Sequence, residues 1–282
     1  MSVSRRRFLA CSAGLASASI LGRPLAAWAR AAADAGLNLG IQMYSLRGYP
    51  VDEAIQHAYD IGFRYLEFYS GMYPLNSTPE QIQAMNEKLK PKELHLTAHG
   101  VNRFTKDHDA NRKIFEFAKA AGFRSLSADP DPESFDSLDK LVAEYDVRIA
   151  IHNHGPRHRY NKVVDVLNAV RDHHPSIGAC ADLGHYIRSG EDPVTVIRSL
   201  GDRLFGVHLK DFAEQKDKTK GVILGQGFLN CESVFAALKQ VNFPADGALS
   251  LEYEENPKDP LADIRECYAI ASAAKKKVEL AG

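Results

Sequence analysis

Short apolar runs alternate with longer segments of helical periodicity from residue 37 to the C-terminus. Most of the apolar runs are nearly continuous, which is typical of parallel strands that are covered on both faces. Eight candidate strands follow one another: Leu37–Tyr44, Phe63–Phe68, Leu94–His99, Arg124–Ser127, Val147–His152, Ile177–Asp182, Leu204–Leu209 and Ala248–Glu252.

The segments between these runs are amphipathic and carry helix start and stop signals. Gly62, Gly122 and Gly201 each follow such a segment, where a helix C-cap often adopts a left-handed conformation. The predicted helices are Val51–Ile61, Thr78–Leu89, Asp107–Ala121, Asp131–Tyr145, Lys162–His173, Asp192–Leu200, Glu232–Val241 and Pro260–Lys276. Eight strand–helix pairs in about 240 residues predict one α/β domain, a (β/α)8 TIM barrel. A doubly wound sheet is less favoured, because no G-x-G-x-x-G follows the first run.

The first 29 residues differ from the rest of the chain. Arg5, Arg6 and Arg7 precede an apolar stretch of small residues, which ends in an A-x-A-like site at 27–29. This order is that of a signal peptide, and the arginine pair before Phe8-Leu9 resembles a twin-arginine export signal. We therefore expect a signal at 1–29, a barrel at 30–282, and a periplasmic or extracellular location. The alternatives are a frayed basic terminus or a membrane anchor, although the stretch is short for about 30 Å of hydrocarbon.

Composition and net charge indicate which classes of partner the protein binds, but they say little about the reaction it catalyses. Hydrophobic residues at 45% and charged residues at 25% are ordinary for a soluble globular protein. Loss of residues 1–29 removes four arginines and no acid, which lowers the formal net charge from −1 to −5. A chain with this net negative charge lacks the excess of basic residues that nucleic-acid binding requires. No membrane association is expected after cleavage of the signal. A small carbohydrate substrate fits better, while the oligomeric state stays open.

The cysteines give no functional signal. Cys11 lies in the expected signal peptide, and Cys180 lies inside an apolar run, as a core residue would. A disulfide between Cys231 and Cys267 is left open.

The candidate chemistry lies at the ends of the last four apolar runs, because active residues of TIM barrels collect where strands end. His152, Asp182, His208 and Glu252 stand at these four ends. Any one of them could simply hydrogen-bond a neighbouring loop, but four consecutive ends of this kind predict a metal site. Two imidazoles and two carboxylates suit one Mn²⁺, Co²⁺, Zn²⁺ or Fe²⁺ ion, whereas Mg²⁺ prefers oxygen ligands.

The motifs around these residues resemble the sugar isomerase/epimerase family with the xylose-isomerase-like barrel. The resemblance covers essentially all of the mature chain. It is carried by Gly40–Arg47, Asp182-Leu183-Gly184-His185, His208-Leu209-Lys210-Asp211 and Glu252-Tyr253-Glu254. It implies a metal bound by Glu, Asp, His and Glu at the ends of strands five to eight. Asp182, His208 and Glu252 then take the last three places, and His185 and Lys210 fall where relatives contact substrate.

The first ligand position departs from the family pattern. The family generally has Glu-Asn-His there, and this chain has His152-Asn153-His154. Family epimerases use two opposed glutamates to move a proton between the faces of the sugar. Because His152 stands where one of these glutamates is expected, the resemblance does not extend to this symmetric exchange. The His-Asn-His variant resembles exported relatives that accompany processing of 3-keto-glycosides by elimination or hydration.

The reactions implied by the resemblance share loss of a proton from the carbon next to a ketone. A metal would stabilise the enediolate charge, and a base would take the proton. Glu252 could be both ligand and base, His154 and His185 are free imidazoles, and Lys210 could stabilise the oxyanion. His154 could equally orient a ligand. Outside this set, Glu67 and His99 could hydrogen-bond sugar hydroxyls or satisfy loop backbone groups.

The leading functional hypothesis is a metal-dependent sugar isomerase/epimerase that acts by enolisation of a keto sugar. A 3-keto-glycoside lyase or hydratase with the same metal site is the close alternative, and a non-catalytic carbohydrate-binding barrel is the next. A DNA-repair barrel of the AP-endonuclease type is opposed by the negative charge and by too few ligands for a three-metal cluster.

Overall fold

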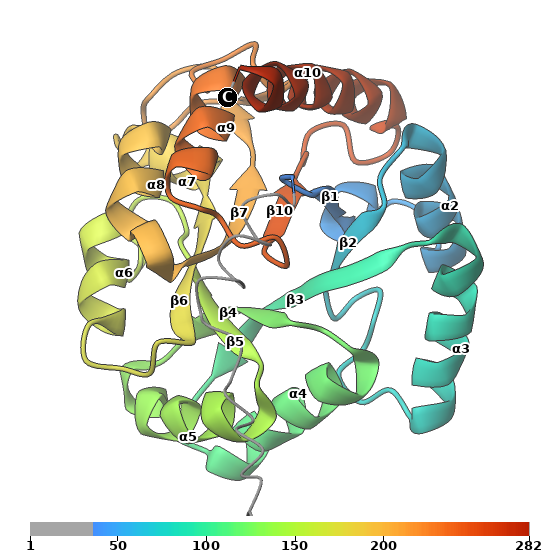
Figure 1. Ribbon diagram of the computed structural model, residues 1–282, viewed down its shortest axis with the longest axis vertical. Coiled ribbons are helices and arrows are strands. Elements are labelled where there is room, and N and C mark those ends of the chain that lie inside the picture. Colours follow the sequence, from blue (N-terminus) through green and yellow to red (C-terminus); the bar gives the residue numbers. More distant parts are fainter. Residues whose placement is uncertain (1–35, 282) are drawn as a thin grey trace, which may run out of the picture.

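The computed structural model describes residues 36–281 and forms a closed parallel barrel ringed by helices (Figure 1). Neighbouring strands follow the order β1-β10-β7-β6-β5-β4-β3-β2, and β2 closes the ring by pairing with β1. The barrel strands are β1 (Leu39–Gln42), β2 (Tyr65–Phe68), β3 (His95–Phe104), β4 (Ser125–Pro130), β5 (Arg148–His152), β6 (Ile177–Asp182), β7 (Leu204–Leu209) and β10 (Ala248–Leu251). The predicted (β/α)8 barrel is confirmed.

Helices connect successive strands and pack outside the barrel (Figure 1). The helices are α2 (Val51–Ile61), α3 (Pro79–Leu89), α4 (His108–Ala121), α5 (Phe135–Tyr145), α6 (Val163–Val170), α7 (Leu183–Arg188), α8 (Pro193–Leu200), α9 (Cys231–Gln240) and α10 (Leu261–Leu280). Residues 36–281 also include the short 3₁₀ helices η1 (Met43–Leu46), η2 (Lys90–Lys92), η3 (Pro132–Ser134) and η4 (Gly201–Arg203). After β7, the strands β8 (Asp211–Phe212) and β9 (Gly221–Val222) form a small antiparallel pair.

Local sequence signals explain where the helices begin and end. Thr78 and Gln81 form a reciprocal capping box at the start of α3, and the Asp107 side chain caps α4. Gly62 ends α2 with φ at 122°, a conformation that side chains with a Cβ rarely adopt.

The expected third strand is longer than predicted. We expected it to end at His99, but β3 continues to Phe104, with an irregular register against β4 between His99 and Asn102. His99 therefore lies within the strand and not at its tip. The sequence hides this extension because Gly100 and Asn102 interrupt the apolar run.

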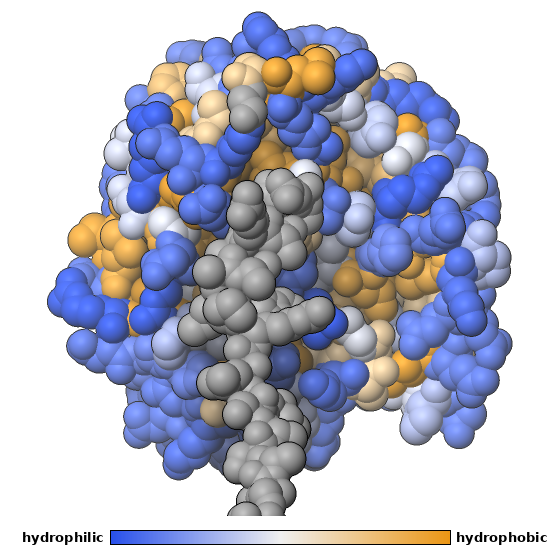
Figure 2. Space-filling view, viewed as in Figure 1, coloured by the Kyte–Doolittle hydropathy of each residue, from blue (hydrophilic) through white to orange (hydrophobic). Residues whose placement is uncertain are grey.

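The core consists of the strands and of the apolar faces of the helices around them. It is almost continuous, and only Ala150, Cys180 and Phe205 form a separate small group. Hydrophilic residues cover much of the outer ring on the face shown in Figure 2. In the part of the chain that the structure describes, no helix has the length and apolar character needed to cross a bilayer.

The described cysteines are not paired. Cys180, Cys231 and Cys267 are buried free thiols, and Cys267 Sγ accepts a hydrogen bond from the backbone N–H of Leu224. The disulfide left open between Cys231 and Cys267 is absent from the structure.

Candidate metal centre

The four predicted ligands converge at one end of the barrel. His152 and Asp182 are the last residues of β5 and β6, His208 lies one residue before the end of β7, and Glu252 directly follows β10. One possible ligand atom from each lies within 4.8 Å of those from the other three, and all four residues are buried. Residues up to 100 positions apart in sequence meet here because the strands are parallel and in register.

The donor atoms face one another at short distances. His208 Nδ1 lies 3.1 Å from His152 Nε2 and 3.2 Å from Glu252 Oε2. Asp182 Oδ2 lies 3.7 Å from His152 Nε2 and 3.9 Å from His208 Nδ1. Asp182 Oδ2 and Glu252 Oε2 are buried and have no well-aligned hydrogen bond. Buried carboxylates are costly without nearby positive charge, and two imidazole nitrogens with two carboxylate oxygens form a donor set that fits a divalent cation bound between them.

Hydrogen bonds from the backbone and from Asn153 hold Asp182 in place. The Asn153 amide donates to the Asp182 carbonyl over 3.0 Å, and Asn153 Oδ1 accepts from the Asp182 N–H over 2.7 Å. Asp182 Oδ1 caps α7 by accepting from the His185 N–H, which leaves Oδ2 directed at the cluster. The Asn of the His-Asn-His segment therefore ties the tip of β5 to the tip of β6.

Lys210 supplies the positive charge that this cluster needs. Its Nζ lies 2.6 Å from Glu252 Oε2, 2.9 Å from Asp182 Oδ2 and 2.6 Å from Glu254 Oε1. Burial opposes charge on the Lys210 ammonium, but the three carboxylates raise its pKa well above the usual value. Burial would likewise raise the pKa of Glu252, yet Lys210 and His208 hold it well below the usual range. Both groups are thus ionised at neutral pH.

Three further imidazoles surround the cluster on the β5 and β6 side. His154 lies edge-on to His152 and stacks on His185, with ring centroids 4.8 and 5.7 Å apart respectively. His158 packs on His154 from outside and pairs with Asp129. Burial lowers the pKa of His154, and it lowers that of His185 to about 4, so both rings are neutral at pH 7. Their Nδ1 atoms have no hydrogen-bond partner in the structure.

Glu67 and His99 are both fully buried, Glu67 in the barrel interior and His99 against Phe117 of α4 and Phe123 outside the barrel strands. Glu67 is fully buried in β2, and its carboxylate binds Ser127, Ser250 and His208. His99 is fully buried in β3, where Nε2 lies 2.9 Å from the Tyr73 carbonyl. We expected sugar hydroxyls or loop backbone groups as the partners of these two side chains. In the structure Glu67 binds other side chains, and His99 faces a loop carbonyl, that of Tyr73.

Asp211, the last residue of the motif His208-Leu209-Lys210-Asp211, has a structural role that the sequence does not predict. Its carboxylate accepts four backbone hydrogen bonds, which run from Phe212 and Leu229 to Oδ1 and from Gly225 and Gly227 to Oδ2, all within 2.9 Å. This carboxylate folds the loop after β7, whose residues Phe212, Gly221 and Val222 line a cavity of about 220 Å³ beside Lys210 and Glu252. The Gly225-Gln226-Gly227 segment is therefore the partner of Asp211.

Replacing Asp211 with alanine should destabilise the protein by about 2–4 kcal/mol, because four backbone N–H groups, of which that of Leu229 is buried, lose their acceptor. Urea unfolding measures this change. Asp211→Asn, which keeps one oxygen, should cost less. An Asp211→Ala variant as stable as the wild type would show that the loop satisfies these groups in another way.

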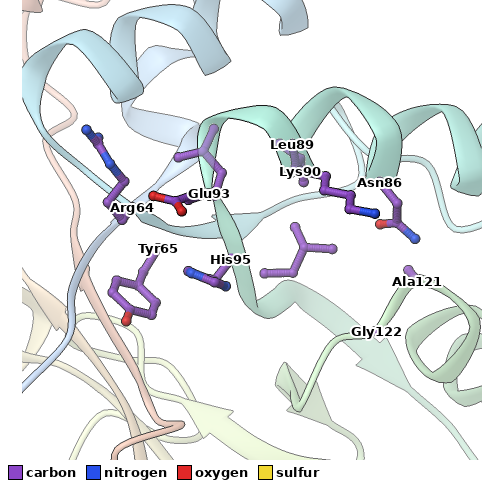
Figure 3. Close-up of a pocket in the computed structure, with 11 residues that line it drawn as sticks. Arg64, Tyr65, Asn86, Leu89, Lys90, Glu93, His95, Ala121 and Gly122 are labelled. Carbon is purple, nitrogen blue, oxygen red and sulfur yellow. The ribbon is translucent and has the colours of Figure 1, made fainter. Parts of the chain in front are cut away.

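A second hollow lies at the opposite, amino end of the strands (Figure 3). Arg64, Tyr65 and His95 line it at the starts of β2 and β3, together with residues at the end of α3. Arg64 donates to the carbonyls of Tyr59 and Phe63, and Tyr65 stacks on His95. These are stabilising contacts, and active residues of TIM barrels lie at the other end.

Known proteins are similar to this chain in sequence and in fold. An inosose dehydratase from Clostridium botulinum is 24% identical over 231 residues, which span 64% of this chain and 76% of the relative. An uncharacterised Parabacteroides distasonis protein of known structure is 25% identical, with a TM-score of 0.66 over 84% of this chain and 98% of its own. The E. coli 3-keto-D-glucoside 4-epimerase is 15% identical, with a TM-score of 0.66 over 84% of this chain and 99% of its own, which supports the fold alone.

Residues 55–270 match the family described as the xylose isomerase-like TIM barrel, which covers most of the strands and all four residues of the cluster. The chain therefore belongs to the xylose isomerase-like TIM barrel family.

Proposed function

We propose that this protein is a metal-dependent enzyme that removes a proton from the carbon next to a ketone in a keto sugar. The observation that carries the proposal is the convergence of His152, Asp182, His208 and Glu252, with the Lys210 ammonium beside them. A divalent ion bound there would supply Lewis-acid stabilisation of a developing oxyanion.

The chain itself provides the groups that move and hold protons. The candidates for the base are Glu252, whose Oε2 lies 2.6 Å from Lys210 Nζ, and the neutral imidazoles of His154 and His185, whose Nδ1 atoms have no hydrogen-bond partner. When the base takes the proton, the electron pair of the C–H bond moves towards the ketone and places negative charge on its oxygen. The protonated Lys210 can stabilise that charge.

The reaction that follows proton removal distinguishes the two leading hypotheses. The cluster has only one glutamate, because His152 occupies the place of the second, and the two-glutamate exchange of epimerases is therefore not available in the same form. The inosose dehydratase relative also favours elimination. We therefore place β-elimination of a hydroxyl or an aglycone first: the enediolate expels the group, which leaves with a proton from an acid. Isomerisation or epimerisation comes second.

The substrate class is an uncharged sugar. Five arginines around the barrel mouth already have protein partners. Arg103 and Arg159 bind Asp131, and Arg157 and Arg188 bind Asp217. Arg47 donates to the backbone carbonyls of Tyr44 and Glu254. A phosphate group would need arginines that are free for bidentate contacts. Export by the twin-arginine route is part of the same proposal, and the residues that carry that signal lie outside those the structure describes.

The test is incubation of the metal-loaded protein with a panel of keto sugars and 3-keto-glycosides in D₂O, followed by NMR and mass spectrometry. Elimination predicts an unsaturated product with loss of water or aglycone. Deuterium at the carbon next to the ketone in an intact sugar would instead support isomerisation or epimerisation. Binding without exchange or product, unaffected by Glu252→Gln, would support the carbohydrate-binding alternative and contradict the proposal.

A further inference from the structure

A layer of polar side chains fills the barrel on the side of the His208 ring away from the metal cluster. TIM-barrel interiors are filled by layers of four side chains from alternate strands, usually bulky and branched apolar ones. In this barrel one layer comes from β2, β4, β6 and β10 and consists of Glu67, Ser127, Cys180 and Ser250. All four are at most 1% exposed. A carboxylate in this position is costly unless it is fully hydrogen-bonded.

Glu67 is fully hydrogen-bonded by its neighbours. The Ser127 hydroxyl donates to Oε1 over 2.6 Å, and the Ser250 hydroxyl donates to Oε2 over 2.7 Å. The third partner is His208, whose Nε2 lies 3.0 Å from Glu67 Oε2. Both oxygens of the Glu67 carboxylate therefore lie against groups that can donate a hydrogen bond.

An acceptor at Nε2 determines what the other nitrogen of His208 can do. An imidazole that binds a metal is neutral and carries one N–H, and the Glu67 carboxylate beside Nε2 favours that N–H at Nε2. The lone pair then lies on Nδ1, the atom that faces His152 Nε2 and Glu252 Oε2 in the cluster. The opposite tautomer would point an N–H into the cluster and leave the Glu67 oxygen facing a lone pair.

We propose that Glu67 is a positioning residue for the metal centre: it holds His208 in the tautomer and ring orientation that present Nδ1 to the ion. The inference rests on the metal binding proposed above and assigns Glu67 no contact with substrate. A purely structural role does not account for the residue, because an apolar side chain could fill this layer without the cost of burying a charge.

The experiment compares Co²⁺ affinity and stoichiometry of the wild type and Glu67→Gln by competition with a chelator that reports free metal. Removal of a partner of this kind typically lowers metal affinity by about 10–100-fold, and we expect a loss in that range. We also expect one ion per chain and a changed visible spectrum of the bound Co²⁺. Ser127→Ala is the matched control. It removes the hydrogen bond to the other oxygen of Glu67 and should change affinity less than about threefold.

A second measurement needs no variant and so does not depend on folding of Glu67→Gln. In the Zn²⁺-loaded wild type labelled with ¹⁵N-histidine, long-range NMR correlations should show one buried histidine protonated at Nε2 and metal-bound through Nδ1, and the His208→Ala spectrum should lack it. Binding through Nε2, a second ion per chain held by Glu67 and Cys180, or equal affinity of the wild type and Glu67→Gln would overturn the assignment. Failure of the wild type to bind any metal would overturn the proposed function itself.

Discussion

Glu252→Gln should lower kcat for proton removal by about 10³-fold or more. The substitution keeps the size of the side chain but removes a charged donor from the cluster and one candidate base. Loss of a positioned base alone typically costs about 10²–10⁴-fold. Glu252 lies 3.2 Å from His208 Nδ1 and 2.6 Å from Lys210 Nζ, so its charge also balances the rest of the centre. The rate of deuterium incorporation or of product formation measures the effect.

Glu254→Gln is the matched control for this prediction. Glu254 lies two residues further along the chain and also pairs with Lys210, but its side chain is 42% exposed and is outside the four-residue cluster. We expect less than about a tenfold loss, in keeping with the small energies of exposed ion pairs. Equal losses in both variants would show that Lys210 pairing, and not a role of Glu252 in the chemistry, determines the rate.

The barrel could be predicted from the sequence because most strands are short apolar runs bounded by helix signals. The expected run Ile177–Asp182 is identical to β6, and Leu204–Leu209 is identical to β7. A predicted strand end is wrong where pairing with a neighbouring strand extends the strand beyond its apolar run. β3 passes through Gly100 and Asn102 to Phe104, and its pairing with β4 supports residues that have no strand signal of their own.

The candidate metal ligands could be predicted because the predicted barrel places the ends of its strands together. Parallel strands end at one rim, so charged residues at successive strand ends lie close together once the fold is known. Glu67 was harder to place because it stands only one residue before the end of β2. Whether such a residue faces the mouth or the interior depends on the stagger between strands and on the pleat, and a single sequence does not specify the stagger.

The role of Asp211 shows a second limit of the sequence. The sequence shows the motif His208-Leu209-Lys210-Asp211 and the glycine-rich segment Gly225–Gly227, but no sequence pattern links the two. Their contact spans a loop of 14 to 16 residues, and the hydrogen bonds come from backbone N–H groups, which every residue except proline carries. Only the three-dimensional path of the loop shows that the glycines allow its backbone to approach the carboxylate.

Lys210→Met should destabilise the metal-free protein by about 3–5 kcal/mol, the usual cost of removing one partner from a buried ion pair. The Lys210 side chain is 6% exposed, and it compensates Asp182 and Glu252, whose side chains are 0% and 8% exposed. Methionine fills similar space but leaves two buried carboxylates uncompensated. At roughly 2–4 °C per kcal/mol for a domain of this size, thermal unfolding should show a Tm lower by about 10 °C.

A bound divalent ion should reverse much of this loss, because it brings two positive charges to the same carboxylates. We therefore expect the difference in Tm between Lys210→Met and the wild type to shrink when Mn²⁺ or Zn²⁺ is added and to return with a chelator. Lys216→Met is the control. Lys216 pairs with Glu214 on the surface, where the two side chains are 53% and 61% exposed. This substitution should change stability by less than about 1 kcal/mol with or without metal. If Lys210→Met loses the same stability in both conditions, the ion does not bind between Asp182 and Glu252, and the metal centre lies elsewhere.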